Sequence, residues 1–247
     1  MSLSALAGRR VLVTRPRELA QGLAALIAQA GGEAVLYPAI EIGDPDDPAA
    51  ARAALGRLQE FDLAVFVSPS AVRKGLELLA RPWPPGPRIA ALGAGTRREL
   101  ESRGLRDIIA PRDGADSEAL LALPQLRHVE GWRVLILRGA GGRELLGETL
   151  AARGASVSSV ECYRRARPAP GAEPAGTLDA ACANSGETLE NLVALLGPAR
   201  LRDTPLFVPH ERVARLARGM GFAAVEVAGP GDEQVLARLL AYFGGAK

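Results

Sequence analysis

Short apolar runs alternate with amphipathic segments along the whole chain. Residues 10–14 (RVLVT) form a β-branched run that predicts a buried strand. Apolar side chains then recur at helical spacing over 17–30, and Gly31 and Gly32 are typical of a helix end. The same alternation predicts helices over 49–59, 69–79, 96–103 and 117–123, strands over 62–68, 88–93 and 107–111, and strand–helix units over 179–196, 205–219 and 223–243.

The stretch 132–165 repeats the pattern of the N-terminus. It predicts a strand, a Gly-rich turn, a helix and a second strand. It aligns with residues 11–40 without a gap at a constant offset of 123 residues, so that Val134 falls on Val11.

A second offset extends the repeat. Shifted by 117 residues, the segment 178–189 falls on 61–72, and Ser185 falls on Ser68. Any series of strands and helices shares apolar strands and glycines at helix ends, which is the alternative explanation. The nearly gap-free register favours an internal duplication.

Strands that alternate with helices predict an α/β fold with mostly parallel sheets covered on both faces. The repeat predicts two similar doubly wound lobes, each with about four strands, joined by two extended crossing segments. Because such sheets bind ligands beyond the carboxyl ends of their strands, we expect the ligand in a cleft between the lobes.

Composition narrows the class of protein. The chain has 247 residues and 48% hydrophobic content, enough for two packed cores. A net charge of +2 with scattered arginines gives no support to nucleic-acid or membrane binding. Cys162 and Cys182 have neither disulfide nor metal spacing, and we find no signal peptide or membrane span. We therefore expect a cytoplasmic protein.

Standard cofactor and nucleophile motifs are missing. The segments 93–98 (GAGTRR) and 139–144 (GAGGRE) lack the third glycine of a dinucleotide-binding motif. The chain has no phosphate-binding P-loop, and Ser185 lacks the frame of a nucleophile elbow. His128 and His210 are too few for a His-rich metal site. We therefore expect no metal, no cofactor and no covalent serine mechanism.

The turns between strands and helices are the remaining candidates. Each directs a helix N-terminus, with unpaired backbone N–H groups, toward one end of a sheet. Exposed helix N-termini favour anions by roughly 0.3–1 kcal/mol each, so several of them suit a ligand with many carboxylates or phosphates.

Polar side chains in these turns have two interpretations. Four hydroxyl residues can hydrogen-bond an anionic ligand or cap their helices, at about 1 kcal/mol each: Ser68, Thr96, Ser117 and Ser185. Capping is favoured for each alone and is compatible with ligand binding. Three arginines can hold carboxylates through paired hydrogen bonds or lie solvated at the surface: Arg15, Arg138 and Arg143.

Tyr163 lies in one of two long helix-free runs, 33–42 and 155–168, which are the natural crossings between lobes. A phenol at a cleft can act as a general acid. Alternatively, its ring packs at a hinge with the hydroxyl on a backbone group. The first copy of the repeat has Ile40 at the matching position, so the phenol belongs to the second copy alone.

Seven segments carry a family resemblance through their order and spacing. They are VLVTRP (11–16), FVSPSAV (66–72), ALGAGT (91–96), ILRGAGGRELL (136–146), VECYRR (160–165), ANSGETLENL (183–192) and FVPHERVARLARGMGF (207–222). Over nearly the whole chain they resemble the uroporphyrinogen-III synthase family.

The resemblance implies a lyase of tetrapyrrole biosynthesis, serving haem, sirohaem or cobalamin. The family cyclises hydroxymethylbilane, a linear polycarboxylate, to uroporphyrinogen III with loss of water and inversion of ring D, by the usual proposal through a spiro-pyrrolenine. It uses no cofactor or metal and binds its substrate largely through backbone amides. By resemblance, Tyr163 is the catalytic residue that assists departure of the hydroxyl.

The resemblance and the turns together give a set of expected substrate-binding residues. They are Arg15, Ser68, Thr96, Arg138, Gly139, Arg143, Ser185 and His210. The chain departs from some relatives after Pro209, where it has His210 and Glu211 in place of hydroxyl residues. A glutamate beside a polyanion is unfavourable unless it turns away, so only His210 is included.

The resemblance also implies how the chain is divided. One lobe is expected to comprise 1–37 and 166–247, and the other 44–155. Residues 38–43 and 156–165 are expected to cross between them. A single split near residue 125 is equally open on the pattern alone.

Two other functions compete with this one. A non-catalytic bilobed module could bind or sense a small anion, but the chain has no export signal or DNA-binding appendage to support it. A group transferase using a nucleotide donor would need a phosphate loop. For the synthase we expect a monomer whose partner is its small-molecule substrate, supplied by hydroxymethylbilane synthase.

Overall fold

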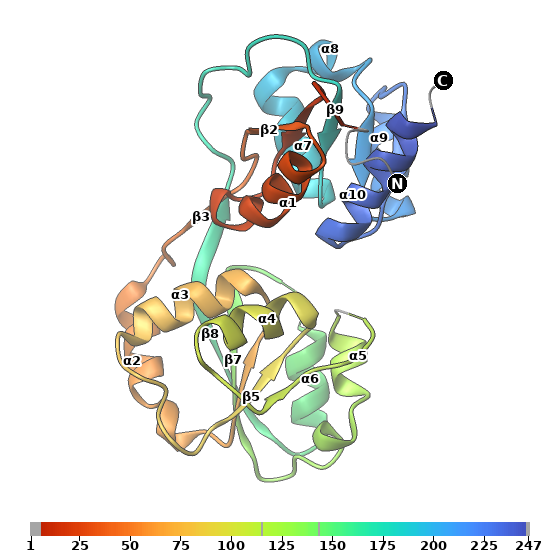
Figure 1. Cartoon of the computed structure of the whole chain (residues 1–247). Coiled ribbons are helices and arrows are strands. Elements are labelled where there is room, and N and C mark those ends of the chain that lie inside the picture. The colour runs from red at the N-terminus through yellow and green to blue at the C-terminus, as the bar shows by residue number, and fades with distance from the viewer. Residues whose placement is uncertain (1–5, 115, 143, 246–247) are drawn as a thin grey trace. The chain divides into compact units, whose positions relative to one another are not determined.

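The computed structural model describes residues 6–114, 116–142 and 144–245. The chain folds into two compact units, which we call the first unit (1–41 and 166–247) and the second unit (42–165). Each unit is a sheet of mainly parallel strands with helices on both faces (Figure 1). The predicted doubly wound α/β class is therefore confirmed.

The first unit has a five-stranded sheet in the order β11-β10-β9-β1-β2. Helices α7, α8 and α9 pack against one face, and α1 and α10 against the other. The elements are β1 (Arg10–Val13), α1 (Arg17–Gln29), β2 (Glu33–Leu36), β9 (Ala180–Cys182), α7 (Gly186–Leu196), α8 (Pro198–Leu201), β10 (Leu206–Val208), α9 (Glu211–Gly219), β11 (Val225–Val227) and α10 (Asp232–Gly244).

The second unit has a six-stranded sheet in the order β3-β8-β7-β4-β5-β6. Helices α2, α3 and α4 cover one face, and α5 and α6 cover the other. The elements are β3 (Glu41–Gly43), α2 (Pro48–Gly56), η1 (Leu58–Glu60), β4 (Leu63–Phe66), α3 (Pro69–Leu79), β5 (Arg88–Ala91), α4 (Ala94–Ser102), β6 (Ile108–Ile109), α5 (Ser117–Leu121), η2 (Pro124–Leu126), β7 (Arg133–Gly139), α6 (Leu145–Ala152) and β8 (Ser156–Ala166).

Burial on both faces explains the apolar strands. All four residues of β4 are buried, because one face of the sheet lies under α3 and the other under α6. Both sheets have more than the four strands expected, since the extended runs at 33–36 and 156–166 join them beside β1 and β7. The short strand β3 adds a sixth strand to the second sheet. Residues 156–163, expected as part of a crossing, are thus paired with β7 in the second sheet.

The strand pairings of the two units follow the offsets of the sequence repeat. Val11 pairs with Ala34, and adding 123 to both numbers gives Val134 and Val157, which pair in β7 and β8. The offset of 117 carries β9, β10 and β11 onto β4, β5 and β6. Both sheets then share one strand order, with β3 added in the second. This agreement supports the duplication, whose origin stays a prediction.

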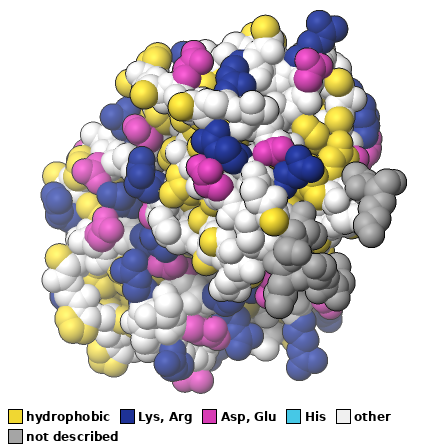
Figure 2. Space-filling model, turned by 45° about the horizontal axis from the view of Figure 1, so that its top comes forward, with side chains coloured by type: hydrophobic (Ala, Val, Ile, Leu, Met, Phe, Trp, Pro, Cys, Tyr) yellow, Lys and Arg dark blue, Asp and Glu magenta, His cyan; other side chains and the backbone are white. Residues whose placement is uncertain are grey.

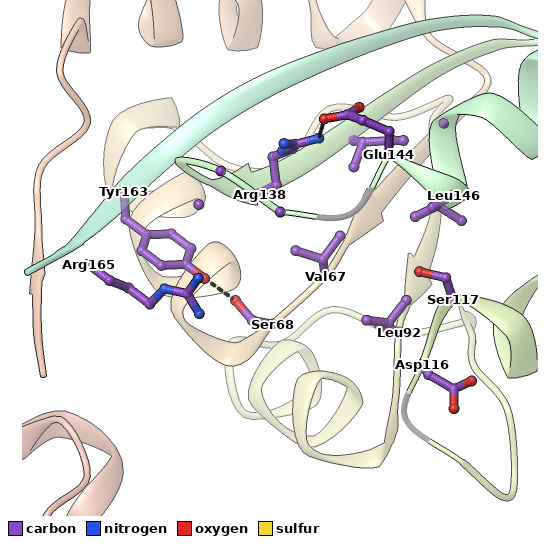
Figure 3. A pocket seen from close by; sticks show the side chains of 15 residues that line it. Val67, Ser68, Leu92, Asp116, Ser117, Arg138, Glu144, Leu146, Tyr163 and Arg165 are labelled. Atoms are coloured by element: carbon purple, nitrogen blue, oxygen red, sulfur yellow. Dashed lines mark hydrogen bonds and ion pairs between the residues drawn. The ribbon is translucent and has the colours of Figure 1, made fainter. Parts of the chain in front are cut away.

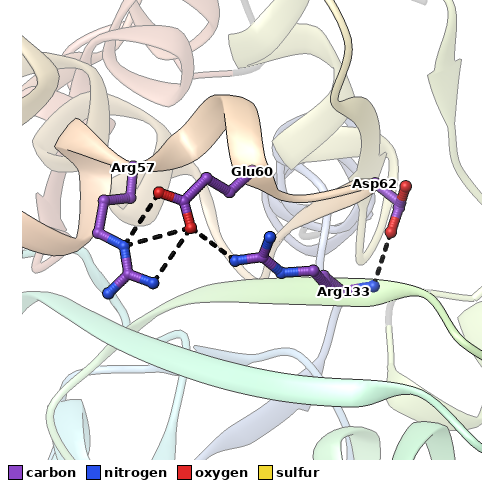
Figure 4. A network of polar contacts seen from close by, with 4 residues as sticks. All are labelled: Arg57, Glu60, Asp62 and Arg133. Atoms are coloured by element: carbon purple, nitrogen blue, oxygen red, sulfur yellow. Dashed lines mark hydrogen bonds and ion pairs between the residues drawn. The ribbon is translucent and has the colours of Figure 1, made fainter.

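A carboxylate joins two strands at the same place in each sheet. Asp179 accepts a hydrogen bond from the backbone N–H of Arg10 at 2.9 Å, and its counterpart Asp62 accepts one from Arg133 at 2.7 Å (Figure 4). Both bonds tie the start of one strand to its neighbour, so the carboxylates set the register of the sheets.

Glu60 forms a second polar contact at the start of β7. Its carboxylate accepts hydrogen bonds from Arg57 and from Arg133, and these bonds lower the pKa of Glu60 to about 2 (Figure 4). The carboxylate therefore stays charged in all but strongly acidic solution. Because its side chain is 36% exposed, the contact contributes little to stability.

On the face of the molecule seen in Figure 2, charge is distributed rather than concentrated. Arginine and acidic side chains are intermingled over the face seen in Figure 2. No helix of the described residues is long and apolar enough to cross a membrane.

We predict that Asp179→Ala destabilises the protein by about 1.5–3 kcal/mol at neutral pH, because it removes hydrogen bonds to a charged acceptor. Burial raises the pKa of Asp179, but bonds from Arg10 and Arg9 outweigh burial and bring the pKa below its ordinary 3.8. The contribution is therefore present above pH 3.8 and is lost as the pH falls through the lower, folded value.

The measurement is the free energy of unfolding in urea at several pH values, with the exposed Asp203→Ala as control. A difference between Asp179→Ala and the parent that stays constant down to pH 2 would contradict the assignment.

Candidate active site

A cavity of about 390 Å³ opens in the second unit at the carboxyl ends of its central strands. Val67 and Ser68 follow β4, Leu92 follows β5, and Arg138 and Gly139 end β7. From β4 the chain continues through α3 to β5, whereas from β7 it continues through α6 to β8 on the other side. The cavity therefore lies at the topological switch point, where doubly wound sheets bind ligands.

An extra residue in β8 shapes the wall of this cavity. Arg138 pairs with Glu161, but the next residue, Gly139, pairs with Tyr163, so Cys162 is an inserted residue. Consecutive residues of a regular strand point to opposite faces, whereas Cys162 and Tyr163 both pack into the cluster beneath α3. The bulge thereby turns the phenol of Tyr163 onto the cavity side of β7.

Gly139 is required by the position of that phenol. A Cβ atom at Gly139 would lie 2.6 Å from Cζ of Tyr163 and 3.0 Å from its hydroxyl oxygen. The backbone N–H of Ala140 also donates to the carbonyl of Tyr163 at 2.8 Å. The ring thus lies directly on the backbone of β7 and is only 5% exposed.

The hydroxyl of Tyr163 lies 3.0 Å from Oγ of Ser68 (Figure 3). Ser68 is the N-cap of α3, and its Oγ accepts the backbone N–H of Ala71 at 3.0 Å. The cap interpretation is therefore confirmed for Ser68, and the same side chain also contacts the phenol. The hydroxyl of Tyr163 hydrogen-bonds with this side chain, and not with a backbone group as the hinge-packing interpretation expected.

Two arginines supply positive charge. Arg138 donates to Glu144 at 2.9 Å, and its side chain is 13% exposed. Arg165 lines the same cavity as Tyr163 (Figure 3). Sequence reasoning missed Arg165, although its place two residues after Tyr163 on one strand was available from the chain.

A glycine-rich turn completes the cavity. Gly141 and Gly142 have φ of 66° and 143°, which favour glycine, so backbone rather than side chains lines this part. Asp116 is the N-cap of α5, in place of Ser117, which is the first residue of that helix. Arg143 lies outside the described residues.

The other predicted residues lie elsewhere. Thr96 is buried within α4, because the extended Gly93 begins that helix two residues earlier than expected. Ser185 caps α7 in the first unit. Arg15, also in the first unit, pairs with Asp232.

His210 is exposed and begins α9 without a side-chain cap bond. Glu211, which follows it, pairs with Arg218 along the same helix at 2.6 Å.

The buried thiol of Cys162, which precedes Tyr163 in β8, has a raised pKa. Burial raises the pKa of Cys162 to about 12, although a backbone hydrogen bond from Arg138 partly opposes this. The group is therefore a thiol and not a nucleophilic thiolate at neutral pH. The described residues contain no group of three His, Cys, Asp or Glu side chains that could hold a metal.

Comparison with known proteins identifies the family. The model of the family described as uroporphyrinogen-III synthase HemD matches residues 21–236. The uroporphyrinogen-III synthase of Salmonella typhimurium is 39% identical over 93% of this chain and 99% of its own. This chain belongs to the uroporphyrinogen-III synthase family. The Escherichia coli member is 37% identical over the same shares.

Solved structures of family members have the same fold. The Helicobacter pylori uroporphyrinogen-III synthetase aligns over 95% of this chain and 99% of its own, with a TM-score of 0.62 and 14% identity. A mutant uroporphyrinogen III synthase from Thermus thermophilus aligns over 95% and 97%, with a TM-score of 0.58 and 20% identity. The resemblance drawn from the seven segments is thus confirmed.

We predict that Gly139→Ala destabilises the protein by about 1–3 kcal/mol, because the new methyl group overlaps the ring of Tyr163. Gly56→Ala is the control, since a Cβ there meets nothing within 4 Å. Unfolding in urea measures both. The penalty should largely disappear in the Tyr163→Ala background; persistence of the full penalty there would show that the ring is not what Gly139 accommodates.

Proposed function

We propose that this chain cyclises hydroxymethylbilane to uroporphyrinogen III, losing water and inverting ring D, with Tyr163 as the general acid. The observation that carries the proposal is a phenol at the switch-point cavity of a uroporphyrinogen-III synthase family member, with its hydroxyl at the cavity wall. Membership of the family makes the enzyme a lyase of tetrapyrrole biosynthesis.

The first step breaks the bond between the hydroxymethyl carbon and its oxygen. The pyrrole nitrogen supplies the electron pair that expels this oxygen, which takes the phenol proton and leaves as water. The last ring then bonds to the first through its substituted α carbon, which gives a spiro intermediate. The bond from that carbon to the neighbouring methylene bridge breaks and re-forms at the free α carbon, so the ring is inverted. The phenolate is the base that takes back the proton lost from this free α carbon. Atoms therefore balance as loss of one water, and Tyr163 is restored.

The charges and the backbone of the cavity suit a polycarboxylate. Arg138 and Arg165 present two guanidinium groups, and the glycine turn presents backbone without side chains. Arg138 already binds a carboxylate, that of Glu144, whose side chain is 62% exposed and can give way to a substrate carboxylate. Of the residues proposed to bind substrate, Ser68, Arg138 and Gly139 line this cavity.

The other described residues proposed to bind substrate lie outside this cavity. Thr96 is buried in α4, and Arg15 is already paired with Asp232. Ser185 and His210 remain proposed substrate contacts, each at the start of a helix of the first unit.

The product of the purified protein tests the activity. Supplied with hydroxymethylbilane made in situ, it should yield uroporphyrinogen III, identified after oxidation and separation of the porphyrin isomers. Isomer I alone, the product of spontaneous closure, would refute the proposed reaction.

Tyr163→Phe should lower kcat by about 10-fold or more with little change in KM, because only the proton donor is lost. Tyr242→Phe, a tyrosine packed among aromatic rings of the first unit, is the matched control. An unchanged rate for Tyr163→Phe would leave the ring with a packing role only.

Arg138→Ala should raise KM about 10-fold or more, since it removes a charged hydrogen bond to a substrate carboxylate. Arg106→Ala is the control, because this exposed arginine lies before β6 at the opposite ends of the strands, where it donates to the backbone carbonyls of Glu101 and Leu105. Equal KM values for the two variants would remove Arg138 from the binding site.

A further inference from the structure

Ser68 has more hydrogen-bonding capacity than capping α3 requires. A hydroxyl offers one proton and two lone pairs. The N–H of Ala71 occupies one lone pair, which leaves the proton and the other lone pair for the hydroxyl of Tyr163, 3.0 Å away. Capping α3 does not require the contact with Tyr163, so that contact needs an explanation of its own.

The first unit shows what such a cap does without a tyrosine. Ser185 corresponds to Ser68 at the offset of 117 and caps α7 through the N–H of Thr188 at 3.1 Å. Its Oγ also lies 2.9 Å from Oγ1 of Thr188 in the same helix. In the second unit the place of Thr188 is taken by Ala71, which has no hydroxyl.

The partner of the serine hydroxyl therefore differs between the units. With alanine in the helix, Ser68 reaches across to β8 and Tyr163, where the first unit has Ile40. The serine–tyrosine pair is specific to the unit that contains the cavity, although the cap is common to both.

We propose that Ser68 is a positioning residue for Tyr163, an inference that rests on the proposed function. In the reactive arrangement Ser68 donates its proton to the phenol oxygen, so that the phenol proton points into the cavity toward the leaving hydroxyl. Ser68 keeps its proton throughout. Its role therefore leaves the atom balance of the proposed reaction unchanged.

The same bond helps after the proton has left. Negative charge then develops on the phenol oxygen, and a donor already aimed at that oxygen stabilises it without rearrangement. The N–H of Ala71 polarises Ser68 from behind, and the N-terminus of α3, an eleven-residue helix, favours negative charge. The effect should therefore fall on kcat rather than on KM.

A direct contact between Ser68 and the substrate is the competing role, since Ser68 also lines the cavity. The two roles differ in one measurable respect. If Ser68 acts through Tyr163, its substitution should change kcat little once the phenol hydroxyl is absent. If Ser68 contacts the substrate directly, its substitution should have the same effect with and without that hydroxyl.

The experiment is a double-mutant cycle of Ser68→Ala and Tyr163→Phe, with kcat and KM measured for the full chain. We expect Ser68→Ala to lower kcat about 10-fold with KM within about 2-fold, and to change kcat less than about 2-fold in the Tyr163→Phe background. Ser68→Thr, which keeps both the hydroxyl and the cap, should retain most of the activity.

Loss of the cap itself is controlled by Asp47→Ala. Asp47 caps α2 of the same unit by accepting the N–H of Ala50 at 2.9 Å, outside the cavity. This variant should lose stability as Ser68→Ala does, but keep its kcat.

Three results would overturn the inference. These are an equal loss of kcat from Ser68→Ala in both backgrounds, a rise in KM without a fall in kcat, or a Ser68→Ala enzyme as fast as the parent. Each leaves the parent enzyme making isomer III, so they are distinct from failure of the proposed function, in which the parent itself makes isomer I only.

Discussion

The inserted residue in β8 is the constraint on which the candidate site depends. Because Gly139 pairs with Tyr163 rather than with Cys162, the phenol lies flat on the backbone of β7 and within reach of Ser68. The bulge joins three segments that are distant in the chain: the end of β4, the end of β7 and the end of β8. A regular β8 would place Tyr163 opposite Ala140 and turn its ring to the other face.

The two units show how one arrangement of strands can carry different chemistry. They share pairing registers and the carboxylates that join their strands, so the scaffold is the same. They differ at single side chains: Arg15 is paired with Asp232, whereas its counterpart Arg138 lines the cavity and pairs with an exposed glutamate. The two units therefore differ in the partners of the side chains at matching turns, and not in the fold.

The sequence pattern predicted most of the fold because buried strands and helix caps leave signals within a few neighbouring residues. Apolar runs such as β4 are apolar since both faces are covered, and Ser68 and Ser185 cap helices through neighbours three residues away. The sequence also placed Tyr163, Arg138 and Gly139 among the candidates. It could not predict the bulge, which depends on the register between two strands, nor the burial of Thr96, which follows from where α4 begins. Arg165 was missed although it follows Tyr163 by two residues, because only the tertiary structure shows that both residues line the cavity.

A neutral acid is the group that this cavity can use. A carboxyl group is normally ionised at neutral pH, so it would have no proton to donate and would repel a polycarboxylate, while a phenol keeps its proton until the leaving group needs it. In the proposed reaction, three groups then stabilise the negative charge that develops on the phenol oxygen: the hydroxyl of Ser68, the start of α3 and the guanidinium of Arg165, which lines the same cavity. None of these groups needs to move for the proton to leave. In the proposed reaction, the orientation of the Tyr163 hydroxyl and the stabilisation of its phenolate therefore depend on the bulge and the cap together, rather than on the tyrosine alone.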